Sequence, residues 1–389
     1  MSTQSNQTES EVKAVRRKAV VRPLELPAGR RVLAISDIHG NLDFLKGVLA
    51  KAAFTPDDIL ILVGDIVEKG PDSLGTLRYV MELSKTHTVY GVCGNCDDLV
   101  ADFCDGEEGF EQPFFHHYLK VWGRRSLLLQ MGEEAGLPVR GPEDLPALRV
   151  LLRQRYQPEL SFLRALPTIL VSDRFLFVHG GVPREEQLEQ LDAWRCMKND
   201  DFRSQGHSFR RWVVVGHWPV TLYDPAIPSA RPIIDRAEHI VSIDGGCVLK
   251  LDGQLNALIL PGREGEDFSY VAYDALPSAV ALDRQEASSG STNIRWGEHT
   301  VTVLERGEEF SLCRHEASGR RLYILNRYLY QQDGVTKCED STDYHLAVEP
   351  GEKLHVVCRT SRGALVKKDG VTGWYRGRLE QCPAKESLM

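Results

Sequence analysis

Short apolar runs alternate with amphipathic segments in the N-terminal part of the chain. The apolar runs have the length of strands and lie at 31–36, 58–63 and 86–92. Between the first two runs, a helix is predicted by apolar side chains at helical spacing, Leu42, Leu45, Val48, Leu49 and Ala52. A second helix is expected around 73–84. Because strands joined by crossover helices pair in parallel, this part predicts a parallel sheet.

Helical and then β patterns follow. Residues 112–166 are mostly helical in pattern, and 168–181 contains two apolar runs around a turn at 172–174, which predicts a hairpin. Further β runs lie at 211–217, 239–246 and 247–260. A two-sheet β-sandwich flanked by helices accommodates both the parallel and the antiparallel strands, so the predicted fold class is α/β.

The pattern changes after Leu260. Polar, turn-forming stretches give way to short β runs, and two of these segments resemble each other weakly. The segments that begin at Gly297 and Gly351 both run from a Gly-Glu turn through a hairpin to aromatic residues. This region is therefore predicted to form one or two small β-barrels.

The chain accordingly divides into four predicted parts. Residues 1–28, rich in Ser, Gln, Glu and Lys, are expected to be a mobile tail. An α/β domain spans 29–262 and includes a helical insertion at 112–166. A linker at 263–284 then leads to the β-barrel region at 285–385.

Composition narrows the possible partners. The chain has 389 residues, 42% of them apolar, and a net charge of -8, which describes a globular protein and disfavours nucleic acid as a partner. No run approaches the roughly 20 apolar residues that cross a bilayer, and no apolar segment follows the N-terminal basic cluster, so we expect a cytoplasmic protein without a membrane partner. Nine scattered cysteines fit reduced thiols. Cys93 and Cys96 form a C-x-x-C pair, but no second pair completes a structural zinc site.

Polar side chains of particular types follow the predicted strands. Each could have a structural role, since Asp or Asn can cap a helix and a histidine can be satisfied at a sheet edge. Five strand ends that each supply an oxygen or nitrogen donor are better explained by a shared site. These residues are Asp37, His39, Asp65, Asn95, His179 and His217.

Six such ligands are more than one ion requires. A carboxylate can bridge two ions, and Asp65 lies at the middle of the set, so we expect a pair of divalent metals roughly 3.5–4 Å apart. Carboxylate, amide and imidazole donors without a thiolate favour Mn²⁺, Fe or Zn over Cu. Manganese is the first choice, with iron and zinc as alternatives.

The ordered motifs resemble those of calcineurin-like metallophosphoesterases, and within them the phosphoprotein phosphatases and their diadenosine-tetraphosphatase relatives. The matching motifs are Asp37-Ile-His39-Gly40, Gly64-Asp65, Gly94-Asn95, His179-Gly180-Gly181 and Gly216-His217. The resemblance implies a β-sandwich in which Asp37, His39 and Asp65 bind one metal. It also implies that Asp65, Asn95, His179 and His217 bind the other, and that a metal-bridging hydroxide attacks phosphorus directly.

Two motifs depart from the family pattern. Glu68-Lys69-Gly70 stands where the family has Asp-Arg-Gly, and Cys96 stands where the phosphatases have a histidine that protonates the leaving alkoxide. Asp65, Lys69, Cys96 and Glu68 are the predicted catalytic residues. Lys69 can still neutralise a phosphate, as a point charge. Other candidates for the acid are Asp97, Asp98, His116 and His117.

Further candidate residues lie outside these motifs. Arg195 and Arg203 are candidates for binding a second phosphate, with solvated helix charges as the alternative, and Asp244 could line the site or form a turn. The C-terminal region resembles bacterial SH3-like barrels. That resemblance implies a possible peptide ligand on Trp374 and Tyr375, although a place in the barrel core is the favoured role for both residues.

The sequence thus predicts a dinuclear metallophosphatase that hydrolyses phosphomonoesters, with protein phosphoserine or phosphothreonine as the first choice of substrate. A hydrolase of diadenosine polyphosphates or another phosphodiester is the alternative enzyme. A pseudophosphatase that binds phosphorylated ligands without turnover is the alternative of a different class.

Overall fold

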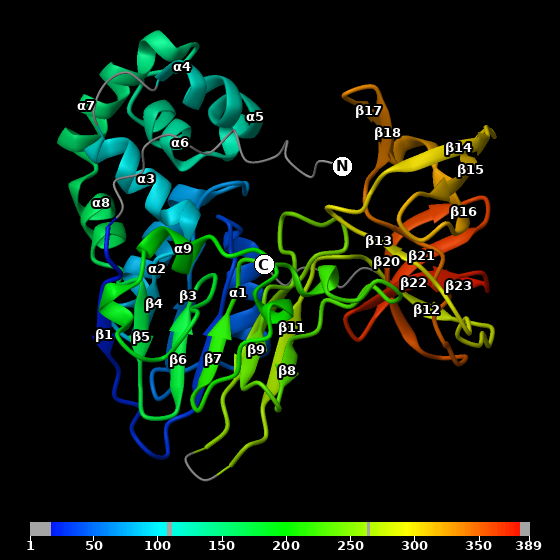
Figure 1. Ribbon diagram of the computed structural model, residues 1–389, viewed down its shortest axis with the longest axis horizontal. Helices are drawn as coiled ribbons and strands as arrows, with labels where there is room; N and C mark the ends of the chain where they lie inside the picture. The colour runs from blue at the N-terminus through cyan, green and yellow to red at the C-terminus, as the bar shows by residue number, and fades with distance from the viewer. Residues whose placement is uncertain (1–16, 107–110, 263–264, 382–389) are drawn as a thin grey trace. The chain divides into compact units, whose positions relative to one another are not determined.

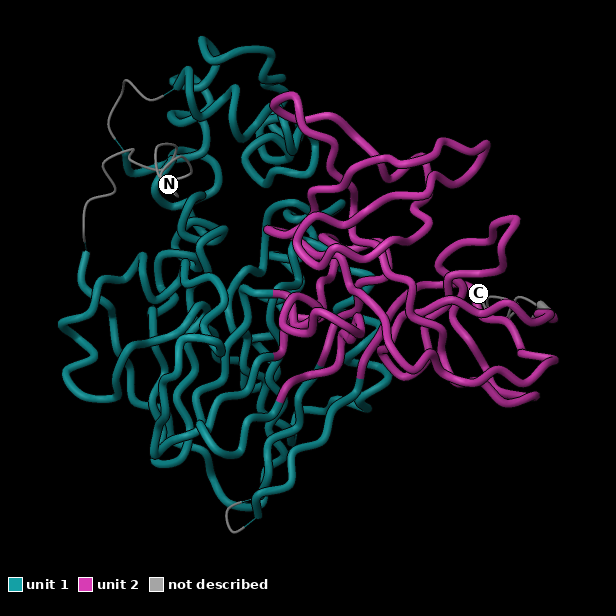
Figure 2. Tube along the Cα trace, turned by 45° about the vertical axis from the view of Figure 1, so that its right-hand side comes forward, with its two compact units in different colours: residues 1–218, 234–242, 257–271 teal, residues 219–233, 243–256, 272–389 magenta. Residues whose placement is uncertain are grey.

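The computed structural model describes residues 17–106, 111–262 and 265–381, and its contacts separate two compact units (Figure 2). Unit 1 comprises 1–218, 234–242 and 257–271, and unit 2 comprises 219–233, 243–256 and 272–389. Two short segments that precede the predicted boundary at residue 262 therefore group with the C-terminal part of the chain. Residues 1–16 of the predicted tail lie outside the described residues.

The first sheet of unit 1 contains the predicted parallel strands. Its order is β11-β10-β2-β3-β4 (Figure 1), and its strands are Ser269–Tyr273, Leu255–Ile259, Val32–Ile35, Ile59–Val63 and Thr88–Val92. β2, β3 and β4 are parallel, while β10 is antiparallel to β2. The predicted crossover helices are α1 (Leu42–Lys51) and α2 (Ser73–Leu83). Strands β2 and β3 are buried along their whole length, which explains their continuous apolar runs.

The second sheet of unit 1 has the order β1-β5-β6-β7-β9-β8. Its strands are Val21–Pro23, Ile169–Val171, Phe175–Val178, Trp212–Val215, Ile240–Ser242 and Ile233–Asp235. β5 and β6 form the predicted hairpin, and β7 and β9 continue in parallel. β1 corrects the prediction of a tail that extends to residue 28, because it pairs with β5 and is flanked by the buried side chains of Ala19 and Leu24.

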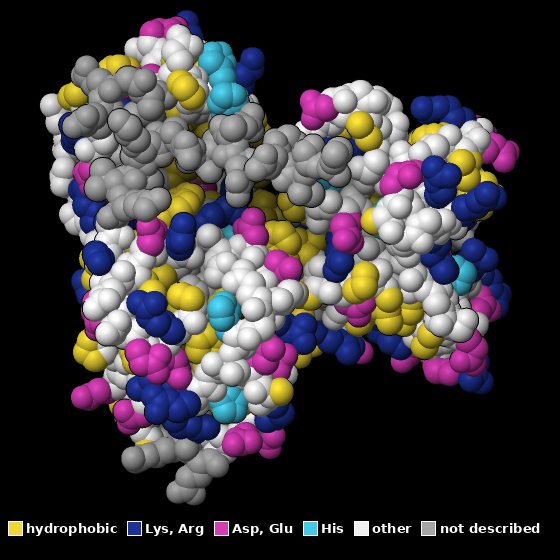
Figure 3. Space-filling model, in the orientation of Figure 1, with side chains coloured by type: hydrophobic (Ala, Val, Ile, Leu, Met, Phe, Trp, Pro, Cys, Tyr) yellow, Lys and Arg dark blue, Asp and Glu magenta, His cyan; other side chains and the backbone are white. Residues whose placement is uncertain are grey.

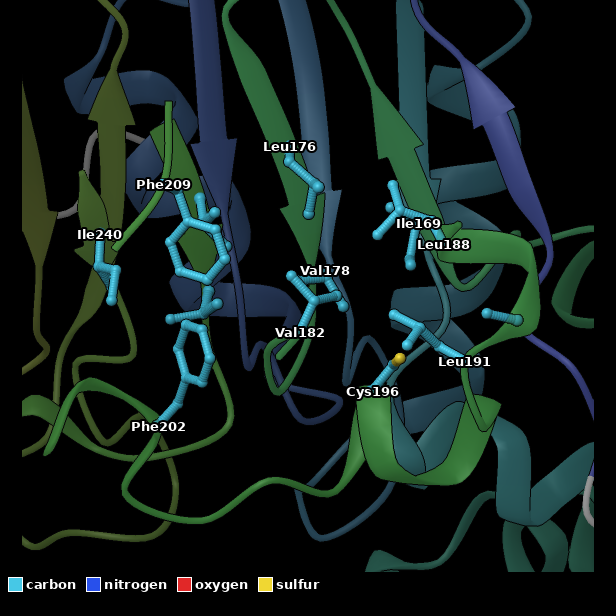
Figure 4. Packing of buried hydrophobic residues seen from close by; sticks show 13 residues of the cluster. Ile169, Leu176, Val178, Val182, Leu188, Leu191, Cys196, Phe202, Phe209 and Ile240 are labelled. Atoms are coloured by element: carbon cyan, nitrogen blue, oxygen red, sulfur yellow. The ribbon is translucent and has the colours of Figure 1, made fainter. Parts of the chain in front are cut away.

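The two sheets lie one behind the other in Figures 1 and 4, which confirms the predicted α/β sandwich. The face of the six-stranded sheet that is turned away from the five-stranded sheet is covered by the segment between β6 and β7. Figure 4 shows Leu176 and Val178 of β6 on the same face of the sheet as Cys196 and Phe202 of this segment, and all four belong to one hydrophobic cluster. The segment contains η4 (Leu188–Gln190), α9 (Ala193–Met197) and η5 (Phe202–Gln205). Burial of each such side chain contributes about 1.5–3 kcal/mol to stability.

Helices fill the region between β4 and β5. They are α3 (Asn95–Asp105), α4 (Glu111–Phe114), α5 (Lys120–Trp122), α6 (Leu127–Glu134), α7 (Leu145–Arg155) and α8 (Gln157–Arg164). Between α4 and α5 runs a π-helix, η1 (Phe115–Leu119), and 3-10 turns lie at η2 (Gly123–Arg125) and η3 (Pro142–Asp144). π-Helical turns are rare and occur frequently at functional sites. Among the described helices, none combines the length and the apolar character needed to cross a bilayer.

Unit 2 consists of small antiparallel sheets, as the short β runs predict. A five-stranded sheet has the order β22-β21-β20-β12-β23, with strands Val371–Tyr375, Gly363–Lys368, Lys353–Thr360, Ser278–Ala281 and Leu379–Gln381. A three-stranded sheet contains β14 (Val301–Glu305), β15 (Phe310–His315) and β16 (Arg321–Leu325). Two-stranded sheets pair β13 with β19 and β17 with β18, at Asn293–Ile294, Ser341–Thr342, Leu329–Gln332 and Val335–Cys338. The remaining 3-10 turns of the unit are η6 (Val220–Leu222) and η7 (Asn326–Tyr328).

The weak sequence repeat corresponds to a structural repeat. The segment after Gly297 forms the meander β14-β15-β16, and the segment after Gly351 forms the meander β20-β21-β22. Each meander has a register shift in its first hairpin, between Val303 and Glu305 in one and between Val356 and Cys358 in the other. The strands β11 and β12 lie within the predicted linker, so residues 269–281 are not a structureless connection.

Candidate metal centre

Loops that follow five strands converge in unit 1. Hydrogen bonds join these loops: Asp37 N donates to Gly64 O at 3.1 Å, and His39 N donates to Asp65 O at 2.9 Å. The Cys96 amide donates to Asp65 Oδ1 at 2.9 Å. Because each loop begins at the carboxyl end of a strand, the sheets fix the positions of the side chains.

Two clusters of possible metal ligands share Asp65. Asp37, Asp65 and His179 form one cluster, and His39, Asp65 and Cys96 form the other, with the ligand atoms of each cluster within 4.8 Å of one another. His179 Nε2 lies 3.3 Å from Asp65 Oδ1, and His39 Nε2 lies 3.7 Å from Asp65 Oδ2. A buried carboxylate between two donor groups is the arrangement that a bridged pair of cations requires.

Two of the buried atoms on the candidate ligands that have no hydrogen-bond partner among the described residues are of particular interest. They are His179 Nε2 and Asn95 Oδ1. The other ring nitrogen of His179, Nδ1, lies 2.8 Å from Val63 O, which as an acceptor requires the proton to be on Nδ1. Nε2 therefore faces the carboxylates and is the ring nitrogen that a cation could use, as in metal-binding histidines held by a backbone carbonyl. Since leaving a buried polar atom unpaired costs about 1–3 kcal/mol, these residues fit bound divalent cations.

His217 lies beside this cluster and has partners of its own. Its ring centroid is 5.2 Å from that of His179, and its amide donates to Asp37 Oδ2 at 3.0 Å. Its Nε2 lies 2.8 Å from Asp200 Oδ1 and 3.2 Å from Lys198 Nζ. The hydrogen bond with His217 lowers the pKa of Asp200, and burial lowers the pKa of His217 to about 4.

Sequence reasoning missed Lys198 and Asp200. Both lie in the same segment as Arg195 and Arg203, the residues that the sequence suggests for binding a second phosphate. Arg195 is exposed, and Arg203 pairs with Asp235 at 3.1 Å. Spacing along the chain carries no signal for Lys198 and Asp200, because only the packing of α9 and its following loop brings them to His217.

The backbone at the centre is strained. Positive φ angles at non-glycine residues occur at Asp37 (53°), His39 (49°), Asp65 (52°), Glu68 (71°), Lys69 (67°) and His217 (66°). Each such residue costs on the order of 1–3 kcal/mol and persists only where the surrounding structure holds it. Strain of this kind clusters at functional sites, and here it falls on residues that were selected from motifs alone.

Two glycines allow the loops to approach. A Cβ atom added at Gly94 would lie 2.2 Å from Asp65 N, and one added at Gly216 would lie 2.3 Å from Asp37 Oδ2. Any larger residue would therefore displace a carboxylate of the cluster. The glycines of the Gly-Asn and Gly-His motifs are explained by this contact.

Burial dominates the electrostatics of the cluster. It raises the pKa of Asp37 to about 6, and together with the charge of Lys69 it lowers the pKa of His39 to about 3. Burial disfavours the charged form of Lys69, but Cys96 and Asp65 outweigh it and raise the pKa of the ammonium. Burial thus disfavours the charged form of Asp37, which bound cations would stabilise, whereas His179, His39 and Lys69 already hold the pKa of Asp65 well below its usual value.

Glu68 is engaged by the helical region. Its Oε2 accepts a hydrogen bond from Tyr118 Oη at 2.9 Å, and its Oε1 accepts from Ser126 Oγ at 3.1 Å and Leu127 N at 2.6 Å. Burial raises the pKa of this carboxyl to about 7, against the effect of these hydrogen bonds. The carboxylate predicted to assist catalysis therefore anchors residues 118–127 next to the centre.

Cys96 is buried within the second cluster. Asn95 Nδ2 donates to its Sγ at 3.4 Å, and burial and Asp65 raise the pKa of the thiol well above its usual value. Cys93 packs with Ala193 and Met197, as expected for a core residue. The eight cysteines in the described part of the chain are all free thiols.

The other candidates for a proton donor have different surroundings. Asp97 Oδ1 accepts from Ile66 N and Oδ2 accepts from Gly94 N, each at 2.9 Å, so this carboxylate ties two loops together. Asp98 pairs with Arg17, and His116 and His117 are exposed. Asp244 belongs to unit 2, where its Oδ1 accepts from Gly246 N at 2.8 Å as in a turn.

Comparison with known proteins extends these observations. Residues 30–241 match the family described as calcineurin-like phosphoesterase. The chain belongs to the calcineurin-like phosphoesterase family. Members of this family use a pair of divalent metals, and the two clusters that share Asp65 supply candidate ligands for such a pair.

Several members resemble this chain. It is 30% identical over 306 residues to a symmetrical bis(5'-nucleosyl)-tetraphosphatase of Dechloromonas aromatica, an alignment covering 72% of this chain and 94% of that enzyme. The enzyme of the same name from Salmonella typhimurium is 40% identical over 114 residues, which are 26% of this chain and 39% of that enzyme. A metallophosphoesterase of Sphaerobacter thermophilus, 17% identical with a TM-score of 0.34, covers 63% of this chain and 88% of its own.

Proposed function

We propose that this phosphoesterase hydrolyses the phosphoric anhydride of dinucleoside polyphosphates, with Mn²⁺ as the preferred metal. The proposal reverses the order of substrates predicted from the sequence, where protein phosphoserine came first. The likeness to the Dechloromonas tetraphosphatase over most of that enzyme's length supports the reversal. The stronger support is chemical and comes from the surroundings of Glu68 and Cys96.

The observation that carries the proposal is the loss of the proton-donor pair. A serine alkoxide is a strongly basic leaving group and needs a positioned acid, whereas a nucleotide released from an anhydride is a much weaker base. Both oxygens of Glu68 are occupied by the helical region, and Cys96 replaces the histidine of the phosphatases. The site therefore suits a leaving group that departs without protonation.

The helical region supplies groups that suit a nucleoside polyphosphate. The segment anchored by Glu68 contains the aromatic Trp122 and three basic side chains, Lys120, Arg124 and Arg125, and it directly follows His116 and His117. Lys69 Nζ lies 5.8 Å from the centroid of the Trp122 ring and so connects this segment to the centre. Cationic side chains bind the remote phosphates, and an aromatic ring can stack on a base.

Asp37, Asp65 and His179, with His39 and Asn95, would hold the metals. When bound, the metals polarise the phosphoryl oxygens and supply an acidified water. Lys69 contributes a positive charge for the phosphate, and Lys198 beside His217 contributes a second. The carboxylate and amide oxygens are the reason to place Mn²⁺ before Fe or Zn, which the imidazole nitrogens also suit.

Hydrolysis of three substrates by the full chain tests the proposal. With Mn²⁺ present, kcat/KM for diadenosine tetraphosphate is expected to exceed that for a phosphoserine peptide by at least about 100-fold, a difference of about 2.7 kcal/mol in transition-state binding. An aryl phosphodiester, whose leaving group is also weakly basic, is expected to fall between them.

The same assay distinguishes the other candidates. Preference for the phosphoserine peptide would overturn the proposal and favour a protein phosphatase. If the chain binds metal but turns over none of the three substrates, a pseudophosphatase is the better description. Arg210→Ala is a suitable control variant, because this exposed arginine of unit 1 is not among the predicted site residues and is expected to leave all three rates unchanged.

A further inference from the structure

Two adjoining grooves lie on unit 2. One has a volume of about 320 Å³ and the other about 540 Å³, and both are lined by Phe310, Tyr323 and Arg362. Phe310 and Tyr323 come from the first meander, and Arg362 lies at the turn between β20 and β21 of the second. The grooves therefore form one continuous surface where the two halves of the structural repeat meet.

The shared centre of this surface is aromatic. The Arg362 guanidinium lies 3.4 Å from the centroid of the Tyr323 ring, whose residue is 45% exposed. Phe310 and Trp374 meet edge to face, with centroids 5.9 Å apart. Trp374 Nε1 donates to Thr342 O at 2.7 Å, which fixes the indole. Tyr375, the other proposed platform residue, is fully buried in the core of the five-stranded sheet.

One end of the surface is basic. Arg320, Arg321 and Arg376 line the smaller groove with Arg362. Arg320 pairs with Asp343 at 2.5 Å. Within the described chain, Arg321 and Arg376 have no ion-pair partner. In Figure 3, the part of unit 2 formed by β14, β15 and β16 shows basic side chains beside hydrophobic ones.

The opposite end is acidic. Glu305, Glu308 and Glu309 line the larger groove. Glu309 accepts a hydrogen bond from Ser361 N at 2.8 Å, whereas Glu305 and Glu308 have no cationic partner in residues 265–381, the described C-terminal stretch. The surface thus runs from carboxylates, across aromatic rings, to guanidinium groups.

We propose that this surface binds an extended peptide segment with basic residues at one end, apolar residues in the middle and acidic residues at the other end. Electrostatic complementarity is the reason, because each end of such a peptide meets the opposite charge. A nucleic acid strand carries a phosphate at every position, and the carboxylate end would repel it. The proposal is independent of the reaction proposed for unit 1.

Fluorescence anisotropy with the full chain tests the proposal. The probe is a labelled peptide of sequence Lys-Lys-Leu-Pro-Leu-Glu-Glu, and saturable binding is expected. The double variant Arg321→Glu with Arg376→Glu is expected to raise the Kd by at least about tenfold. Glu305→Lys with Glu308→Lys is expected to have a similar effect from the acidic end.

A matched control variant and a comparison of the peptide with an oligonucleotide make the result decisive. Lys353→Glu with Arg359→Glu changes two exposed charges on β20 away from the grooves and is expected to leave the Kd unchanged. Equal losses in this control and in the groove variants would overturn the proposal, as would the absence of saturable binding. Tighter binding of a labelled thymidine octanucleotide than of the peptide would also overturn it and indicate a single-strand site. Hydrolysis of an aryl phosphate should stay unchanged in every variant.

Discussion

The variant Asp65→Asn is expected to lose hydrolysis by at least about 10³-fold, which corresponds to about 4 kcal/mol of transition-state stabilisation. Asp65 belongs to both ligand clusters, and its Oδ1 also accepts the Cys96 amide. An amide has one fewer oxygen and no charge, so it cannot join two cations. Steady-state hydrolysis of diadenosine tetraphosphate and the metal content of the purified protein measure the two consequences together.

The control for this variant is a buried carboxylate elsewhere. Asp58 is buried and pairs with Arg31 at 2.7 Å, away from the centre. Asp58→Asn is expected to lower stability while metal content and kcat stay close to those of the unchanged protein. Near-normal rates in Asp65→Asn would remove the shared-carboxylate site from the account.

The variant Glu68→Ala is expected to destabilise the protein by about 3 kcal/mol, because Ser126 Oγ and the Leu127 amide, both buried, lose their acceptor. Release of this segment also moves Trp122 and the basic side chains around it away from Lys69. We therefore expect KM for diadenosine tetraphosphate to rise more than kcat falls. Urea denaturation and initial-rate kinetics measure these effects.

Two further variants separate anchoring from proton transfer. Glu68→Gln keeps an oxygen that can accept the hydrogen bond of the Leu127 amide, so it is expected to recover most of the stability and the KM. If Glu68 acted as a proton donor, Gln could not replace it. Glu134→Ala removes an exposed partner of Arg78 and is expected to cost less than about 1 kcal/mol. A large fall in kcat for Glu68→Gln, with stability unchanged, would show that Glu68 takes part in the chemistry.

The site could be predicted from sequence where chain position and spatial position coincide. The ends of β2, β3, β4, β6 and β7 gather at sheet edges, so motifs that follow these strands indicate a common site without any coordinates. The same reasoning explains why the α/β sandwich and its crossover helices were predicted within a few residues. Buried parallel strands and amphipathic helices have clear periodic patterns.

Other features depend on contacts between distant segments. The sequence shows Glu68 as a substitution within a catalytic motif, and only the fold brings Tyr118, Ser126 and Leu127 to its carboxylate. Lys198 and Asp200 approach His217 for the same reason. Because of the contacts of Glu68, we expect a weakly basic leaving group, and we therefore propose a dinucleoside polyphosphate as the substrate in place of a phosphoserine protein.

Short elements were also harder to predict. β1 has three residues and lies in a stretch whose polar composition suggested a tail, yet its pairing with β5 orders it. Segments 219–233 and 243–256 precede the predicted boundary, and they group with unit 2 through pairings such as Ser229 with Val371. The composition of a stretch is an average over many residues, so it does not reveal a pairing that involves only a few of them.

Electron paramagnetic resonance of the metal-free protein titrated with Mn²⁺ tests the central claim most directly. Two manganese ions that share Asp65 are expected to give an exchange-coupled spectrum at two equivalents per chain, and Asp65→Asn should abolish it. The coupled signal and hydrolysis of diadenosine tetraphosphate should appear together during the titration. Full activity with only isolated six-line manganese signals would contradict a dinuclear centre in this protein.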